Sequence, residues 1–198
     1  MSHGPSDPSR RVLPPGQRRS DGLQVKHYGR VPRINLATWD LTVTGATADG
    51  GTAKLSLDQV RALPRSDVRG DLHCASKWSV PDLEWGGVLV RTLLDLVPPA
   101  GDATHVLAWA EYGYSATLRI EDVASPRALL ADELAGEPLT PEHGWPLRLV
   151  VPHLYGFKGP KWLRGLEYLR GPSRGFWEER GYHVVGDAWR EERYSYQE

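Results

Sequence analysis

Glycine and proline interrupt the apolar segments of this chain at short intervals, and this punctuation constrains the fold more than any other feature. The two residue types occupy 37 of the 198 positions, about 19% where average usage gives about 12%. Both end or weaken regular elements. We therefore expect short strands and loops to outweigh long helices, in a chain whose length suits one domain with its own core.

Several apolar segments carry the patterns typical of strands. The alternation is clearest where Trp39, Leu41 and Val43 alternate with polar residues before Gly45. The predicted strands cover residues 39–45, 68–74, 104–110, 114–120 and 147–151. Residues 111–113 are expected to connect two of them in a hairpin-like turn.

Two segments instead have the spacing or boundary residues of short helices. Residues 56–63 precede Pro64, and residues 88–97 carry apolar side chains at helical spacing before a pair of prolines. Strands interrupted by brief helices, without regular βαβ alternation, predict an α+β fold with mixed β-sheets rather than a doubly wound sheet.

Composition also divides the chain. Residues 1–24 are rich in Ser, Pro, Gly and Arg, so we expect a flexible N-terminal arm that can lie along the domain surface. Residues 25–175 form the expected domain. Residues 176–198, with six acids against three bases, form a C-terminal extension packed on the domain or trailing from it.

Charge and hydropathy exclude some classes of protein. A net charge of -1 gives no nucleic-acid signal, and no apolar stretch approaches the roughly 18 residues of a membrane span. The arginine pairs at residues 10–11 and 18–19 are not followed by an apolar export segment, so a cytoplasmic location is expected. Phosphate-loop and dinucleotide fingerprints are absent, and one cysteine with no H-x-x-x-H pair makes structural zinc unlikely on sequence grounds.

Cys74 is the only cysteine, so it is a buried hydrophobe, a nucleophile or a metal ligand. A nucleophile needs a histidine base, and adjacent His73 would point to the opposite face of a strand. Four distant histidines stay possible partners: His27, His105, His143 and His153. A thiolate could alternatively hold a soft or redox-active metal between tryptophan walls.

Basic residues concentrate between Phe157 and Arg174, with five against the single acid Glu167. Such a cluster is more often a hydrated surface than a binding site. It is nevertheless a candidate anion site.

Four ordered motifs resemble the molybdopterin-binding domain of the sulfite oxidase family, in its short bacterial subgroup. They are Cys74-x-x-x-Trp78-Ser79, Trp85-x-Gly87-Val88, the run from Gly144-Trp145-Pro146 to Pro152, and Tyr155-Gly156-Phe157-Lys158-Gly159-Pro160-Lys161-Trp162-Leu163. The match runs from about Val25 to Leu169, and Gly175-Phe176-Trp177 to Gly186-Asp187 resembles the subgroup's ending.

This resemblance implies a sulfite-oxidase-type fold that holds one molybdenum cofactor, a pterin dithiolene with a phosphate tail. Cys74 would be the protein ligand of molybdenum. Arg148 and the Gly159-Pro160-Lys161 turn would hold the pterin and its phosphate, with Lys158 adding charge. The further implied pterin contacts are His27, Tyr28 and His143, and the implied substrate contacts are Tyr112 and Tyr114. Lys77 is a candidate for drawing in an anionic substrate, and Asp71 and His73 for supporting the ligand.

The implied activity is oxygen-atom transfer on a small sulfur oxyanion or sulfoxide. Eukaryotic-type sulfite oxidases carry haem and dimerisation domains that have no counterpart here, so we expect a monomer that exchanges electrons with a separate partner. The alternatives are a non-catalytic molybdopterin binder or carrier, and a cofactor-free thiol enzyme that uses Cys74 as nucleophile.

Overall fold

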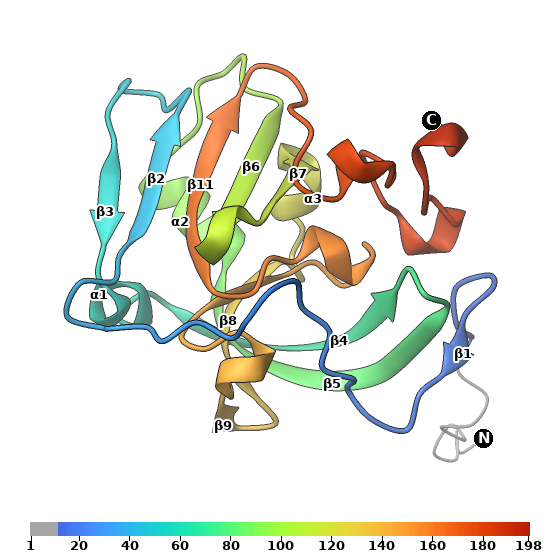
Figure 1. The fold of residues 1–198 in the computed structure, drawn as a ribbon. Helices are drawn as coiled ribbons and strands as arrows, with labels where there is room; N and C mark the ends of the chain where they lie inside the picture. Colours follow the sequence, from blue (N-terminus) through green and yellow to red (C-terminus); the bar gives the residue numbers. More distant parts are fainter. Residues whose placement is uncertain (1–11) are drawn as a thin grey trace, which may run out of the picture.

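Two β-sheets dominate the fold in a computed structural model that describes residues 12–198 (Figure 1). The first eleven residues of the expected N-terminal arm, including the arginine pair at 10–11, lie outside the described residues. The first sheet contains β1 (Arg18–Arg19), β4 (Arg65–Cys74), β5 (Trp78–Leu89), β8 (Leu129–Leu134), β9 (Glu137–Pro138) and β10 (Arg148–Val150). The second contains β2 (Leu41–Gly45), β3 (Ala53–Leu55), β6 (His105–Ala110), β7 (Ser115–Arg119) and β11 (Leu163–Leu169).

β5 organises the first sheet. It pairs antiparallel with β4, and this pairing places Cys74 opposite Trp78 at the turn between the two strands. Because a strand has two edges, the other edge of β5 receives β1 near its start and β8 near its end. β1 runs parallel to β5, with Arg18 beside Trp78 and Arg19 beside Ser79.

β11 lies at the centre of the second sheet, whose order is β3-β2-β11-β6-β7. It runs parallel to β2 and antiparallel to β6. Gly165 allows a close approach in this sheet, because a Cβ there would lie 2.1 Å from the ring of Trp109. β11, which lies within the basic segment 157–174, is thus held between two long-range partners.

Short helices join the strands. They are α1 (Leu57–Arg61), α2 (Val90–Leu96) and α3 (Ile120–Val123), with single 3-10 turns η2 (Glu111–Gly113), η3 (Pro141–His143), η4 (Gly156–Lys158), η5 (Glu178–Arg180), η6 (Ala188–Arg190) and η7 (Ser195–Gln197). Ser56 and Gln59 form a capping box at the start of α1. None of the helices within residues 12–198 is long and apolar enough to cross a membrane.

The main core lies around the second sheet and α2, and includes the fully buried Leu41, Leu93 and Leu166. A smaller cluster around Trp85 lies within the first sheet. Burial of these side chains supplies most of the driving force for folding.

The α+β prediction is confirmed, and the five predicted strands correspond to β2, β4, β6, β7 and β10. The predicted helix at 88–97 begins only at Val90, since Val88 and Leu89 complete β5. A short apolar run does not by itself distinguish a buried strand from a helix. β5 itself was not predicted, because Pro81 and the glycines at 86–87 hide its pattern.

Both ends of the described chain pack on the domain near the turn between β4 and β5 (Figure 1). Within the N-terminal arm, residues 17–20 bond to the start of β5. The C-terminal extension buries Glu178, His183 and Arg193. The two segments also meet, since Arg193 donates to the Pro15 carbonyl over 3.3 Å.

Candidate molybdopterin site

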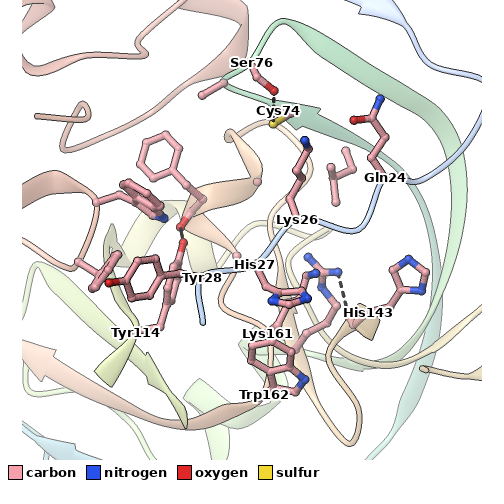
Figure 2. Close-up of a pocket in the computed structure, with 18 of the residues that line it drawn as sticks. Gln24, Lys26, His27, Tyr28, Cys74, Ser76, Tyr114, His143, Lys161 and Trp162 are labelled. Carbon is pink, nitrogen blue, oxygen red and sulfur yellow. Dashed lines mark hydrogen bonds between the residues drawn. The ribbon is translucent and has the colours of Figure 1, made fainter. Parts of the chain in front are cut away.

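A cavity of about 390 Å³ collects side chains from distant parts of the chain (Figure 2). Its lining includes the segment at residues 23–28, the end of β4, the turn before β7, the two residues before β11 and residues 176–182. Nine of the eleven predicted site residues line it: His27, Tyr28, Cys74, Tyr112, Tyr114, His143, Arg148, Gly159 and Lys161. The structure thus brings together most of the positions predicted from the sequence.

Cys74 ends β4 at one end of this cavity. Its thiol is partly exposed, and Sγ lies 3.0 Å from the hydroxyl of Ser76. His73 faces the opposite side of the strand, as expected for a neighbour, and its buried Nδ1 lies 2.7 Å from the Ser79 hydroxyl. Within residues 12–198 the hydrogen-bond partner of the thiol is therefore a hydroxyl and not an imidazole base.

The backbone of Cys74 is fixed from the N-terminal arm. The Gln17 Nε2 group donates to the Cys74 carbonyl over 3.2 Å, and the Lys77 N–H donates to the same oxygen over 3.0 Å. The Gln17 Oε1 atom accepts from the Ser79 hydroxyl over 3.1 Å. One side chain of the arm therefore links the cysteine turn to the start of β5.

Arg148 supplies a buried positive charge at the cavity. It is 3% exposed, and one guanidinium nitrogen donates to the His143 carbonyl over 3.0 Å. Its Nε has no hydrogen-bond partner within the described residues, and none of their ion pairs involves it. Burial lowers the pKa of this guanidinium to about 10, which still leaves it charged at neutral pH.

Lys161 and His143 lie beside Arg148. Lys161 donates to the Glu142 carbonyl over 2.7 Å, and burial together with the Arg148 charge lowers its pKa to about 7. Burial lowers the pKa of His143 as well, with Lys161 and Arg148 adding to the effect. A Cβ on Gly144, whose φ is +113°, would lie 3.1 Å from the Cβ atoms of both Arg148 and Lys161. Glycine at this position lets the two cationic side chains converge.

The structure corrects the expected role of Lys158. This lysine is fully buried outside the cavity lining, where it forms an ion pair with Glu178 and donates to the Val184 carbonyl over 2.6 Å. Its charge is therefore satisfied inside the protein and does not face an anion in the cavity.

The turn that follows Lys158 differs in part from the prediction. The Gly159 N–H, expected to meet a phosphate, donates to the Gly156 carbonyl over 3.1 Å. Pro160 is buried outside the lining, and its carbonyl accepts from the Leu149 N–H. Lys161 is thus the residue of this turn whose side chain faces the cavity.

Two other candidates near Cys74 also lie outside the lining, namely Asp71, expected to support the ligand, and Lys77, expected to attract an anionic substrate. Asp71 is buried and accepts from the Asp82 N–H over 3.0 Å. Lys77 is exposed at the turn, with a left-handed φ of 70°. Neither side chain forms part of the cavity wall.

The predicted tyrosines line the cavity in different environments. Tyr112 is half exposed, with the Arg30 guanidinium 5.6 Å from its ring centre. The Tyr114 hydroxyl donates to the Phe157 carbonyl over 2.6 Å, and burial raises its pKa. Its proton is thereby engaged, so the hydroxyl meets a ligand as an acceptor or through its ring.

Sequence reasoning missed several lining residues. They are Gln24, Lys26, Ser76, Phe176, Trp177 and Tyr182, together with others from the same segments. The signal for residues 176–182 was available, because their aromatic run was part of the quoted subgroup ending. It was outweighed by the acidic composition of the extension, which suggested a solvated tail.

Two of the four candidate histidine bases for Cys74, His105 and His153, have partners outside the cavity lining, whereas His27 and His143 line the same cavity as the thiol. His105 pairs with Thr104, and His153 lies 2.8 Å from an oxygen of Asp122. Across residues 12–198 no group of three or more His, Cys, Asp or Glu side chains forms a metal cluster. A metal at Cys74 would therefore need most of its ligands from a cofactor.

The donor set fits the molybdenum cofactor. A partly exposed thiol at one end of the cavity suits a metal that takes one protein sulfur. The orphaned Nε of Arg148, with Lys161 beside it, suits an anionic group such as the pterin phosphate at the other end. Figure 2 shows this separation, with Cys74 and Ser76 apart from Lys161, His143 and Trp162.

Comparison with known proteins gives the same assignment. Residues 28–177 match the family described as "Oxidoreductase molybdopterin binding domain". The uncharacterized oxidoreductase YuiH of Bacillus subtilis is 40% identical over 192 residues, which cover 96% of both chains. Sulfite oxidase of Arabidopsis thaliana is 28% identical over 83% of this chain, which spans 50% of that protein.

The methionine-sulfoxide reductase catalytic subunit MsrP of Gluconobacter oxydans is 32% identical over 66% of this chain, which spans 47% of that protein. The sulfane dehydrogenase SoxCD of Paracoccus pantotrophus shares the fold, with a TM-score of 0.67, 21% identity, and coverage of 74% of this chain and 42% of that one. The chain therefore belongs to the sulfite oxidase family of molybdopterin-dependent oxidoreductases, whose cofactor is the molybdenum cofactor.

Proposed function

We propose that this protein catalyses oxygen-atom transfer on a small sulfur oxyanion or sulfoxide and exchanges electrons with a separate redox partner. The observation that carries the proposal is the presence, in one cavity, of the Cys74 thiol and of the buried Arg148 guanidinium, whose Nε has no partner within residues 12–198. The similarity to sulfite oxidase and to protein-methionine-sulfoxide reductase supports this reaction class.

When bound, the molybdenum cofactor supplies two-electron oxygen-atom transfer. The protein's own task is to bind and orient it. Cys74 would lose its proton and hold the metal, while Gln17 fixes the backbone from which the sulfur projects. Arg148 would hold an anionic oxygen through its planar fork, and Lys161 would add a second cation.

The aromatic lining contributes by limiting water. Trp78 is buried beside the cysteine turn, and Phe176 and Trp177 are half-buried at another wall. Electrostatic interactions strengthen where water is excluded. The contacts of Arg148 and of the thiol would therefore be stronger in this cavity than at an open surface.

Substitution Cys74→Ser tests the proposal. A hydroxyl is a harder and far less acidic ligand than a thiol, so we expect oxygen-atom transfer to sulfite or from sulfoxides to fall at least about 100-fold. Pterin content, measured by fluorescence after oxidation, should be retained in part through Arg148 and Lys161. Ser66→Ala, on the same strand outside the cavity, is the control.

Two results would overturn the proposal. Full activity in Cys74→Ser would remove this residue from the metal. A folded protein that carries molybdenum but turns over neither sulfite nor any sulfoxide would instead support a carrier. The expected cytoplasmic location and monomeric state stay predictions, which cell fractionation and sedimentation would test.

A further inference from the structure

Five aromatic side chains form a continuous wall of the cavity. They are Tyr28, Tyr114, Phe176, Trp177 and Tyr182, and we call them the aromatic wall. Phe176 contacts three of the others, with ring centres 4.8 Å from Tyr28, 5.6 Å from Tyr114 and 5.3 Å from Trp177. Trp177 in turn lies 5.2 Å from Tyr182. Ring faces and edges, more than polar atoms, therefore meet a ligand on this side.

The aromatic wall is held rigidly from behind. The Phe176 N–H donates to the Ser115 carbonyl over 2.9 Å, and the Arg180 guanidinium lies 3.7 Å from the Phe176 ring centre. The next residue after Trp177 is Glu178, the buried partner of Lys158. A surface that is ordered before a ligand binds loses little entropy on binding.

Of the two buried or partly buried cations of the cavity, Arg148 is close enough to act on the Tyr114 hydroxyl, whereas Lys161 lies farther away. Figure 2 shows Lys161, next to Trp162 and His143, apart from Tyr28 and Tyr114. In the proposed function, Arg148 and Lys161 hold the cofactor's anionic end. A doubly charged sulfur oxyanion against the ring faces of the aromatic wall would lose hydration that these faces do not replace, which is costly.

Lys26 is the residue that would favour an anion instead. Figure 2 shows its nitrogen pointing toward Cys74, and its side chain is exposed to solvent. An exposed lysine keeps much of its hydration and gains little from one anion. Lys26 therefore favours an anionic substrate, whereas the aromatic wall favours an uncharged one. Substitutions at the two places can distinguish these possibilities.

We propose that the aromatic wall binds the uncharged apolar group of an organic sulfoxide, so that this class of substrate, and not sulfite, is preferred. This inference rests on the proposed function and narrows it. In the reaction the S–O bond of R2S=O breaks, sulfur gains two electrons, and two protons convert the oxygen to water. Two equivalents of a one-electron donor, reduced viologen in the assay, are oxidised.

The kinetic test compares methyl phenyl sulfoxide, dimethyl sulfoxide and sulfite on the molybdenum-loaded protein. We expect Trp177→Leu and Phe176→Leu to raise KM for methyl phenyl sulfoxide about tenfold, because aromatic contact is lost. KM for dimethyl sulfoxide should change by less than about threefold. Trp189→Leu, an exposed tryptophan of the same extension outside the cavity, is the matched control.

A binding measurement separates this inference from the proposed function. Methyl phenyl sulfone, which has the same apolar group and serves as a non-reacting probe, should bind the wild-type protein and quench tryptophan fluorescence. Its affinity should fall about tenfold in Trp177→Leu and stay unchanged in Lys26→Met. If the protein turns over no substrate but binds the sulfone in this way, the proposed oxygen-atom transfer is wrong. The binding of an apolar group by the aromatic wall is then still supported.

Two outcomes would overturn the inference. One is unchanged sulfone affinity and sulfoxide KM in both wall variants, with melting curves that show a folded protein. The other is efficient sulfite oxidation whose KM rises in Lys26→Met and is unaffected by Trp177→Leu.

Discussion

Lys158 and Arg148 are both cations buried in the interior, yet their surroundings differ. Lys158 is fully buried and pairs with the Glu178 carboxylate. Arg148 is nearly as buried, has its Nε without a partner, and forms none of the ion pairs within residues 12–198. Burial lowers the pKa of both groups, and Glu178 opposes this effect only at Lys158.

This difference distinguishes a cation that stabilises the fold from a cation that binds a ligand. A buried charge without a counterion is strongly destabilising unless something else neutralises it. Lys158 obtains its counterion from the C-terminal extension, so it stabilises the fold. Arg148 has no counterion among residues 12–198, so we infer that its counterion is the anionic ligand.

The largest expected effect comes from breaking the Lys158 pair. Glu178→Gln would leave a buried ammonium without a counterion, so the free energy of unfolding should fall by about 3 to 5 kcal/mol. Urea denaturation followed by tryptophan fluorescence measures it. The double variant Lys158→Met/Glu178→Leu should recover most of the loss. A single variant as stable as wild type would remove the structural role of this pair.

Arg148→Met should have the opposite effects, with stability kept and cofactor lost. Removing a buried charge without a counterion should leave the cofactor-free protein as stable as wild type or up to about 4 kcal/mol more stable. Cofactor retention should instead fall about 10- to 100-fold, measured as molybdenum and pterin per protein. If this variant unfolds like Glu178→Gln and keeps its cofactor, the distinction between the two cations is wrong.

A third cation, Lys161, extends the comparison because its titration should change how stability depends on pH. Its pKa is about 7 in the folded protein and near its ordinary value of 10.5 in the unfolded chain. The unfolded chain therefore binds more protons between these values, so the free energy of unfolding of the cofactor-free protein should rise from pH 7 to pH 10. Lys161→Met should flatten this rise. Carbon NMR of the lysine side chains should show one titration near pH 7.

The smallest expected effect concerns Gln17. Both Gln17→Ala and Gln17→Glu lose the donor to the Cys74 carbonyl, at a cost of about 1 kcal/mol, while Gln17→Glu keeps the size and an acceptor. We expect both variants to change the alkylation rate of Cys74 in the cofactor-free protein. Ser20→Ala, in the same arm, should leave it unchanged. An alkylation rate that changes only in Gln17→Ala would indicate packing rather than the hydrogen bond.

The sequence allowed Cys74, Arg148 and Lys161 to be predicted because their motifs resemble a known family. It did not reveal that Lys158 is neutralised by Glu178, since that pairing depends on how the extension folds back. The short strands were predictable from alternation and flanking glycines. β5 was not, because it contains a proline and two glycines and is defined by pairing with β4.

The aromatic wall is another feature that the sequence alone did not predict. Composition correctly reported that residues 176–198 are acidic, but it did not indicate which side chains turn inward. Phe176 faces the cavity because its backbone bonds to Ser115 and Glu178 is drawn to Lys158. Both contacts join different elements of the fold, so local patterns do not reveal them.

The position of the aromatic wall in the chain bears on how the enzyme matures. A ribosome makes residues 176–182 after every other segment that lines the cavity, and Lys158 emerges before its partner Glu178. A nascent chain that already displays Cys74 and Arg148 therefore has an open site on one side. Residues 176–182 therefore complete the cavity lining last.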